Sequence, residues 1–237
     1  MLLYILRHGD PIYNPDSLTP RGQLQAQALA KRLARYGVDE LYASPLIRAQ
    51  QTAAPTAALL NQPVETLDWT NESTAWGEFS VEENGRRYWI FHSSRRMRLR
   101  ESAIRARGLQ WYDDPLFADT RAASGYRRIL AESDAFLAAH GYEHDSENCR
   151  YIARTPNDRR VAVFCHQGFG LSWLGAMLDI PLPVTWVNMD FGHTGMTVVE
   201  FRADNAGLCV PKLLTLSNDA HLYAEGLPTM YQNRIYF

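Results

Sequence analysis

The sequence has few cysteines and no long hydrophobic run. Its three cysteines, Cys149, Cys165 and Cys209, are scattered and form no Cys-x-x-Cys pair, which argues against a disulfide framework and for reduced thiols. No uninterrupted apolar run is long enough to cross a bilayer, and the apolar run at residues 2–6 is too short for a secretory signal. We therefore expect a cytoplasmic protein with no membrane partner.

The sequence also has almost no lysine and little net charge. Only Lys31 and Lys212 among its 24 basic residues are lysines, and the net charge is -2. With no global field to attract a polyanion, we expect no nucleic-acid partner. Residues 86–107 hold eight arginines and one acid, Glu101. This segment could be a lid that recognises a second anionic group, an RNA-contacting patch, or a solvated or interface-forming insertion.

What is present is the composition of a globular protein, 46% hydrophobic and 21% charged over 237 residues. Apolar runs at residues 2–6, 38–43, 64–67 and 159–165 predict buried strands. Helical patterns lie between them: one begins at Thr19 and Pro20, a second at Ser44 and Pro45, and others cover residues 126–137 and 171–178. Residues 194–201 are β-rich.

This alternation predicts an α/β protein with three layers, α/β/α, and a mostly parallel central sheet. We expect one domain over residues 1–237, with an insertion at about 78–120 forming a cap or lid. Ligands of such sheets bind beyond the carboxyl ends of the strands. His8 and His166 each follow a predicted strand, so both are expected at this edge.

Phosphoryl transfer through a protein nucleophile needs an attacking atom, fixed positive charge around the phosphoryl oxygens and an acid for the leaving group. A neutral His8 can attack phosphorus, and nearby arginines would keep its pKa low. Arg7 is adjacent to it, and Arg48 is expected one turn into its helix, near the positive end of the dipole. These residues indicate a phosphate site.

Four separated motifs carry a specific resemblance. They are Arg7-His8-Gly9 with Asn14, then Leu18-Thr19-Pro20-Arg21-Gly22 with Gln25-Ala26, then Ser44-Pro45-Leu46 with Arg48, Ala49 and Thr52, and Cys165-His166-Gln167-Gly168. In this order and spacing the chain resembles the histidine phosphatase superfamily, also called phosphoglycerate-mutase-like proteins. The resemblance implies that His8 becomes phosphorylated and that Arg7, Arg48 and His166 form the phosphate pocket, with Asn14 as a further contact.

The resemblance also implies a carboxylate after the third strand that protonates the leaving group. Glu72 is the best match, although its spacing to Gly77 is one residue longer than the family pattern. Glu78 follows closely and is the alternative acid. Geometry decides between them before pKa does.

These residues predict a metal-independent phosphomonoester hydrolase, a phosphatase of the histidine acid type with a phosphohistidine intermediate on His8. Its partner is a small-molecule phosphomonoester, without metal or other cofactor, and a homodimer is compatible with the sequence. A phosphoglycerate mutase, which returns the phosphate to the substrate, is the alternative. A protein that binds phosphorylated ligands without turnover is a third hypothesis.

The remaining histidines and Cys165 receive structural interpretations. We expect His193 to be a hydrogen-bonded structural residue, although it could approach the pocket. His140 and His144 have the i, i+4 spacing of a metal pair, but the helix is expected to end before His144 and no third ligand is evident. Cys165 precedes His166 on a strand, so the two side chains point to opposite faces and the thiol belongs to the core.

Overall fold

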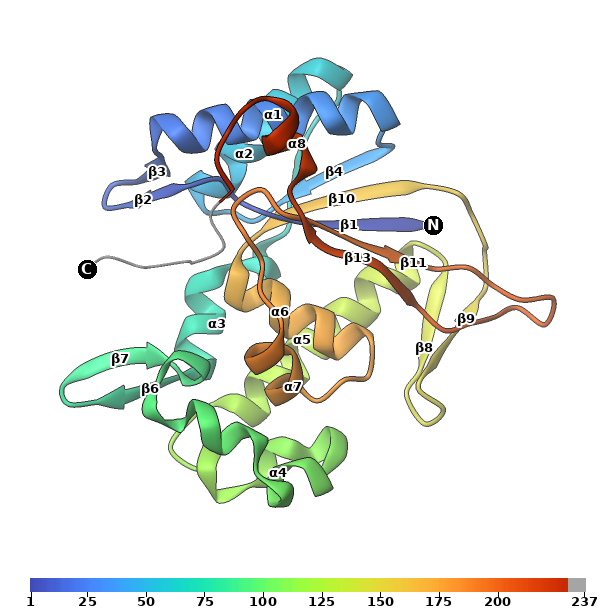
Figure 1. The fold of residues 1–237 in the computed structure, drawn as a ribbon. Helices are drawn as coiled ribbons and strands as arrows, with labels where there is room; N and C mark the ends of the chain where they lie inside the picture. The colour runs from blue at the N-terminus through green and yellow to red at the C-terminus, as the bar shows by residue number, and fades with distance from the viewer. Residues whose placement is uncertain (230–237) are drawn as a thin grey trace.

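The computed structural model describes residues 1–229, and a six-stranded sheet crosses its middle (Figure 1). In spatial order the strands are β13 (Lys212–Asn218), β11 (Met196–Glu200), β1 (Leu2–Arg7), β10 (Arg160–Cys165), β4 (Glu40–Ala43) and β5 (Glu65–Thr66). From β1 to β5 neighbouring strands pair in parallel, whereas β11 and β13 are antiparallel. The mostly parallel sheet predicted from the sequence is confirmed.

One face of the sheet is covered by α1 (Pro20–Tyr36), α2 (Ile47–Leu60) and the short α8 (Ala220–Ala224) (Figure 1). Helix α1 begins as the sequence predicts, because the Thr19 side chain accepts a hydrogen bond from the Gly22 amide at 3.0 Å. Leu29 and Leu33 on its inner face pack with Leu6 of β1 in one buried cluster. This cluster holds the first layer on the sheet.

The opposite face carries α3 (Glu72–Phe79), α5 (Ala122–Ala139), α6 (Gln167–Met177) and α7 (Leu182–Asn188) (Figure 1). All residues of α6 are buried, because the sheet, α3, α5 and α7 surround it. Leu3 and Ile5 of β1 face this side, while Tyr4 and Leu6 face α1. Successive side chains of β1 therefore point into two separate cores, one on each face of the sheet. This arrangement confirms the α/β/α layering.

Short strands extend this framework. The hairpin of β2 (Pro11–Tyr13) and β3 (Asp16–Leu18) follows β1 directly. A separate sheet contains β12 (Leu208–Cys209), β9 (Arg150–Ala153) and β8 (Tyr142–Asp145). Within residues 1–229, no helix is both long enough and apolar enough to span a bilayer.

Residues 80–117 lie outside the three layers, beyond α7 in Figure 1. They form the hairpin of β6 (Ser80–Glu83) and β7 (Arg86–Trp89), the helix α4 (Ser102–Ala106) and 3-10 turns at Ile90–His92, Ser94–Arg100, Gly108–Asp113 and Pro115–Phe117. Trp111 is fully buried, and its ring meets Trp186 of α7 edge-on at 5.2 Å. We call residues 80–117 the cap, and this aromatic contact anchors it to the domain.

Several arginines of the cap contact residues outside the cap. Arg95 makes a two-pronged ion pair with Asp119 at 2.6 Å, and Arg100 donates to the Asn188 side chain at 2.5 Å. Arg96 donates to the Val187 carbonyl at 3.2 Å. These arginines therefore tie the cap to its surroundings. The three functional interpretations of the arginine-rich segment remain predictions.

Two helices begin elsewhere than the sequence pattern indicates. Helix α2 starts at Ile47 rather than at Ser44 and Pro45, because the Ser44 amide bonds to the Phe164 carbonyl at 2.9 Å and prolongs the sheet. Helix α6 starts at Gln167, before the predicted residues 171–178, since it follows β10 after a single residue. Both shifts bring polar residues to the carboxyl edge of the sheet.

Candidate active site

Two histidines meet where β1 and β10 end. The strands pair in parallel with Arg7 opposite Cys165, so His8 and His166 follow side by side. Their ring centroids lie 5.1 Å apart, and both side chains are buried. Cys165 is buried in the core, as predicted.

The hydrogen bonding of His8 identifies its free nitrogen. Nδ1 lies 2.7 Å from the carbonyl oxygen of Gly9, which can only accept, so Nδ1 carries the proton. In the neutral ring Nε2 then holds a lone pair. Burial, His166 and Arg7 lower the pKa of His8 well below its usual value of 6.5. His8 is thus neutral, with Nε2 available as a nucleophile.

The backbone after His8 fits tightly between two helices. A Cβ on Gly9 would lie 2.6 Å from the carbonyl oxygen of Gly22 in α1, so only glycine fits there. The Gly9 amide donates to the Thr52 hydroxyl of α2 at 3.0 Å, and that hydroxyl donates to the Arg48 carbonyl. Both helices therefore fix the position of His8.

His166 is held from one side only. Its Nε2 lies 2.7 Å from the Ser44 hydroxyl, whereas Nδ1 is buried and has no hydrogen-bond partner among residues 1–229. Burial, followed by the charges of Arg48 and Arg7, lowers the pKa of His166 well below 6.5. The neutral ring of His166 therefore has one nitrogen without a hydrogen-bond partner and lies near the positive charges of Arg48 and Arg7.

Two buried arginines supply this charge. Arg7 donates from Nη1 to the Phe191 carbonyl at 2.6 Å. Arg48 is the second residue of α2, not one turn into the helix as expected, and it pairs with Asp16 at 2.8 Å. Its Nε is buried without a partner among the described residues. The Phe191 carbonyl thus helps to hold the Arg7 guanidinium, and the Asp16 carboxylate helps to hold that of Arg48.

Glu72 reaches the same place from the start of α3. Its Oε1 accepts the Gly168 amide at 3.0 Å and its Oε2 accepts the Phe169 amide at 2.8 Å. These amides belong to the first turn of α6, directly after His166. Burial raises the pKa of Glu72, although the two amides and the nearby arginines oppose this rise. A carboxyl group that retains a proton more readily than usual therefore lies beside His166.

The alternative acid, Glu78, is engaged elsewhere. Its two carboxylate oxygens bind Nε and Nη2 of Arg128 at 2.8 and 2.7 Å, and this pair joins α3 to α5. Arg128 also donates to the Trp69 carbonyl at 3.0 Å. Glu78 has therefore a structural partner, whereas Glu72 contacts the turn that carries His166.

Asn14 is exposed, unlike the buried histidines and arginines of the site. It is exposed at the turn between β2 and β3 and makes no hydrogen bond among the described residues. Asp16 in the same hairpin pairs with Arg48, and the ring of Tyr13 lies 5.4 Å from the Arg48 guanidinium. The hairpin therefore borders the site, and the phosphate contact of Asn14 stays a prediction.

His193 is not the hydrogen-bonded structural residue that the sequence analysis favours. Its ring centroid lies 5.9 Å from that of His8, and its Nε2 is buried without a partner in the described chain. The nearest acidic atom, Oδ1 of Asp10, is 3.7 Å from Nδ1. A third imidazole therefore borders His8.

His140 and His144 do not share a helix face. His140 follows α5, where its Nδ1 donates to the Phe136 carbonyl at 2.7 Å. His144 lies in β8 between Asp134 and Asp179, at 3.0 and 3.2 Å. Residues 1–229 contain no cluster of three or more His, Cys, Asp or Glu side chains that could hold a metal ion.

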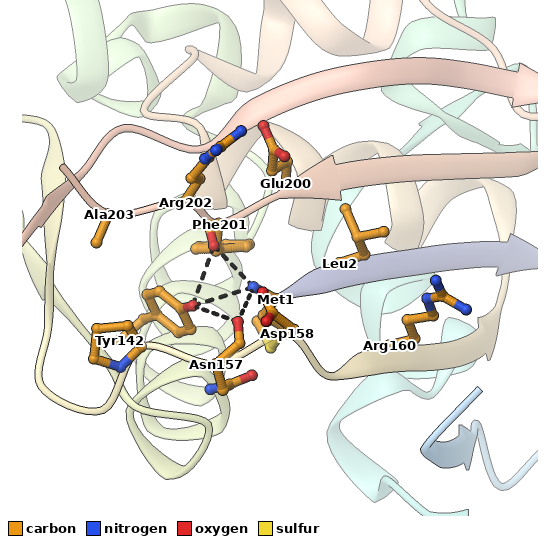
Figure 2. A pocket seen from close by; sticks show the side chains of 11 residues that line it. Met1, Leu2, Tyr142, Asn157, Asp158, Arg160, Glu200, Phe201, Arg202 and Ala203 are labelled. Carbon is orange, nitrogen blue, oxygen red and sulfur yellow. Dashed lines mark hydrogen bonds between the residues drawn. The ribbon is translucent and has the colours of Figure 1, made fainter. Parts of the chain in front are cut away.

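Two cavities lie at different distances along the chain from His8, and only one of them is lined by a residue next to His166. One, of about 640 Å³, opens at the amino end of β1, where the Met1 amine donates to Tyr142, Asn157 and Phe201 (Figure 2). It lies at the opposite end of β1 from His8. The other, of about 340 Å³, is lined by Gln167 and by residues of the cap and α7.

Comparison with known proteins agrees with this geometry. The family model described as "Histidine phosphatase superfamily (branch 1)" matches residues 3–141, more than half of the chain. The chain belongs to this superfamily. The match contains Arg7, His8, Arg48 and Glu72, while His166 lies beyond it.

Curated relatives match this chain only in part. An uncharacterized protein of Mycobacterium tuberculosis is 39% identical over 74 residues, 27% of this chain and 36% of that protein. "Putative phosphoserine phosphatase 2" of Hydrogenobacter thermophilus is 30% identical over 96 residues, 37% of this chain and 45% of that protein. The matched stretches thus cover less than half the length of these relatives.

Several solved structures share the fold over nearly the whole chain. A phosphoserine phosphatase of Entamoeba histolytica, in complex with 3-phosphoglyceric acid, is 19% identical with a TM-score of 0.58 and covers 93% of this chain and 98% of its own. A mycobacterial glucosyl-3-phosphoglycerate phosphatase is 18% identical with a TM-score of 0.58, over 91% and 98%. The alpha-ribazole phosphatase of Shigella flexneri is 18% identical with a TM-score of 0.55, over 92% and 97%.

The groups that orient the two histidines were not predicted from the sequence. Ser44 and Thr52 were named only as parts of motifs, yet their hydroxyls contact His166 and Gly9. A polar residue between a predicted strand and a predicted helix was the available signal for Ser44. No local signal distinguished His193 from any other loop histidine, because its proximity to His8 depends on the fold.

Proposed function

We propose that the protein is a phosphomonoester hydrolase that needs no metal and forms a phosphohistidine on His8. One observation carries the proposal: the ring of His8, whose Nε2 holds the lone pair, lies 5.1 Å from the ring of His166, and Nδ1 of His166 and Nε of Arg48 are buried without partners among residues 1–229. Buried polar atoms usually have partners, and a phosphoryl oxygen would supply them. The arginine charges favour the anion further.

The reaction then proceeds in two steps. Nε2 of His8 attacks phosphorus, the bond from phosphorus to the ester oxygen breaks, and Glu72 gives its proton to the departing alcohol. The Glu72 carboxylate next takes a proton from water, which attacks the phosphohistidine. Inorganic phosphate leaves, and neutral His8 and protonated Glu72 are restored.

The leaving group would occupy the cavity of about 340 Å³ that Gln167 lines. Gln167 follows His166 directly and precedes the two amides that bind Glu72, so this cavity borders the turn that carries the proposed acid. Phe91 and Trp186 offer apolar surface there, and Arg96 a positive charge. The cap would thereby select the alcohol.

The names of similar proteins support hydrolysis rather than mutase chemistry. A curated relative and several solved structures are named as phosphatases of phosphoserine, glucosyl-3-phosphoglycerate or alpha-ribazole phosphate. A mutase would use the same pocket but return the phosphate to the substrate. The product of turnover therefore discriminates between the two.

A turnover screen of phosphomonoesters in the presence of a chelator tests the proposal, with His8→Ala as the control. We expect metal-independent release of inorganic phosphate by the wild type and none by the variant. Isomerisation of phosphoglycerate without phosphate release would show a mutase. Saturable binding of a phosphate ester with no turnover across the panel would show a binding protein.

A further inference from the structure

The loop Gly192–Gly195, between α7 and β11, lies against the end of β1. The Thr194 amide donates to the carbonyl oxygens of Arg7 at 3.1 Å and of His8 at 3.3 Å. The Arg7 amide donates in turn to the Gly195 carbonyl at 3.4 Å. These bonds place His193 beside the nucleophile through the backbone itself.

The side chain of His193 makes no hydrogen bond with the described residues 1–229. It is 15% exposed, and its ring is tilted 36° to the ring of His8 at a centroid distance of 5.9 Å. Its Nδ1 is 3.7 Å from Oδ1 of Asp10, which is beyond hydrogen-bond distance. Asp10 instead accepts from the Thr19 hydroxyl at 2.7 Å through its other oxygen.

The Nε2 atom of His193 is the unsatisfied group. It is buried and has no hydrogen-bond partner within residues 1–229. Burial and the charges of Arg7 and Arg21 lower the pKa of His193 to about 2, so the imidazole is neutral. With the proton on Nε2, the neutral imidazole offers one N–H donor there at no cost in like-charge repulsion against the arginines. A phosphoryl oxygen is the acceptor that the neighbouring nucleophile would bring.

We propose that His193 is a further phosphate-binding residue of this site, whose Nε2–H donates to an oxygen of the phosphoryl group carried by His8. This inference rests on the proposed function. His193 then binds the phosphoryl group through a hydrogen bond from an uncharged donor, while the arginines bind it through charged donors. A donor of this kind acts on both the bound phosphate and the transition state.

Two substitutions separate this role from a structural one. His193→Phe keeps a planar ring and removes both nitrogens, whereas His193→Gln places an amide N–H where Nε2 lies. We expect His193→Phe to lower kcat/KM roughly 100-fold, the lower end of the loss seen for a removed oxyanion donor. His193→Gln should recover most of that loss. His193→Ala replaces His193→Phe if the phenylalanine variant does not fold.

Calorimetric titration with inorganic phosphate supplies a readout that does not require turnover. We expect the Phe variant to bind phosphate about tenfold or more weakly, and the Gln variant to bind it nearly as the wild type does. The proposal is overturned if the Phe variant binds phosphate and turns over normally. It is also overturned if the Phe and Gln variants lose equal affinity and equal thermal stability. A wild type that binds phosphate but hydrolyses no ester would refute the proposed function alone.

Discussion

Oε2 of Glu72 accepts a hydrogen bond from the amide of Phe169 at 2.8 Å, across 97 residues of sequence. This bond ties the first turn of α3 to the first turn of α6. Since α6 begins directly after His166, the proposed acid and the second histidine of the pocket are positioned by the same turn. The roles proposed for Glu72 and His166 therefore depend on one structural element.

Replacing each of the two candidate acids by glutamine tests which one acts. Glu72→Gln should lower kcat roughly 100-fold or more on alkyl phosphates, because the alcohol then leaves without a proton. The loss should be much smaller on an aryl phosphate with an acidic leaving group. Steady-state kinetics on both substrate types measures this difference.

Glu78→Gln is the matched control. It leaves Arg128 with a neutral partner, so we expect a loss of about 2–4 kcal/mol in the free energy of unfolding. Turnover per folded molecule should stay near that of the wild type. A loss of turnover in Glu78→Gln equal to that in Glu72→Gln, with the same dependence on the leaving group, would assign the acid to Glu78.

The pH dependence of kcat/KM follows from opposite shifts in two groups. Burial lowers the pKa of His8 well below 6.5, so the proposed nucleophile is neutral even in mild acid. Burial raises the pKa of Glu72, so the proposed acid keeps its proton to a higher pH than an ordinary glutamate does. Activity should therefore be highest between these two pKa values and fall as pH rises through that of Glu72.

The profile should be measured from about pH 4 to about pH 9, with correction for the second ionisation of the ester near pH 6. Glu72→Gln should lose the alkaline decline, since no titrating acid remains. A rate that instead climbs tenfold per pH unit up to about 6.5 would mean that His8 titrates like an ordinary histidine.

The Ser44 hydroxyl is expected to position His166. Ser44→Ala leaves Nε2 of His166 buried without a partner, and we expect roughly a tenfold loss of kcat/KM. Thr56→Val is the control, because the Thr56 hydroxyl is buried in α2 and has no partner in the described chain. Equal kinetic effects of the two substitutions, measured on the same ester, would show that the hydroxyl of Ser44 does not orient the ring.

Short-range signals account for what the sequence could predict. Leu2–Arg7 alternates between two cores, and Thr19 caps α1 through a neighbour three residues away, so both elements could be identified locally. The edge of the sheet where His8 and His166 meet followed from the parallel topology alone. Local chemistry and fold class thus predicted the centre of the site.

Other features of the structure could not be predicted from the sequence, because they depend on contacts between residues far apart in the chain. The Ser44 amide continues the ladder of β4 by bonding to Phe164, so α2 starts three residues after Ser44. His193 reaches His8 only because β11 pairs with β1. The sequence of the cap shows no regular spacing of apolar residues, because the cap consists mainly of 3-10 turns around Trp111.

The free energy of unfolding should depend on pH through the ionisation of His144, which lies away from the candidate active site. Burial by itself lowers its pKa, but the carboxylates of Asp134 and Asp179 outweigh burial and raise it to about 9. The folded-state pKa therefore exceeds the unfolded value of about 6.5. The resulting stabilisation, about 1–2 kcal/mol, is fully present below pH 6.5 and is lost as pH rises through 9.

Urea unfolding of the wild type and His144→Gln at about pH 6 and about pH 9.5 measures this contribution. The variant should be less stable at the lower pH, and the difference between the two proteins should shrink at the higher pH. Turnover at saturating substrate should be equal in both. A stability difference that is the same at both pH values would refute the ionised His144.

The central claim is that His8 carries the phosphoryl group, and rapid-quench labelling with a substrate that bears a radioactive phosphate tests it most directly. We predict an acid-labile, alkali-stable phosphoenzyme that forms as fast as turnover requires, maps to His8 and is absent from His8→Ala. An acid-labile phosphoenzyme retained in His8→Ala, or turnover by that variant at the wild-type rate, would contradict the claim.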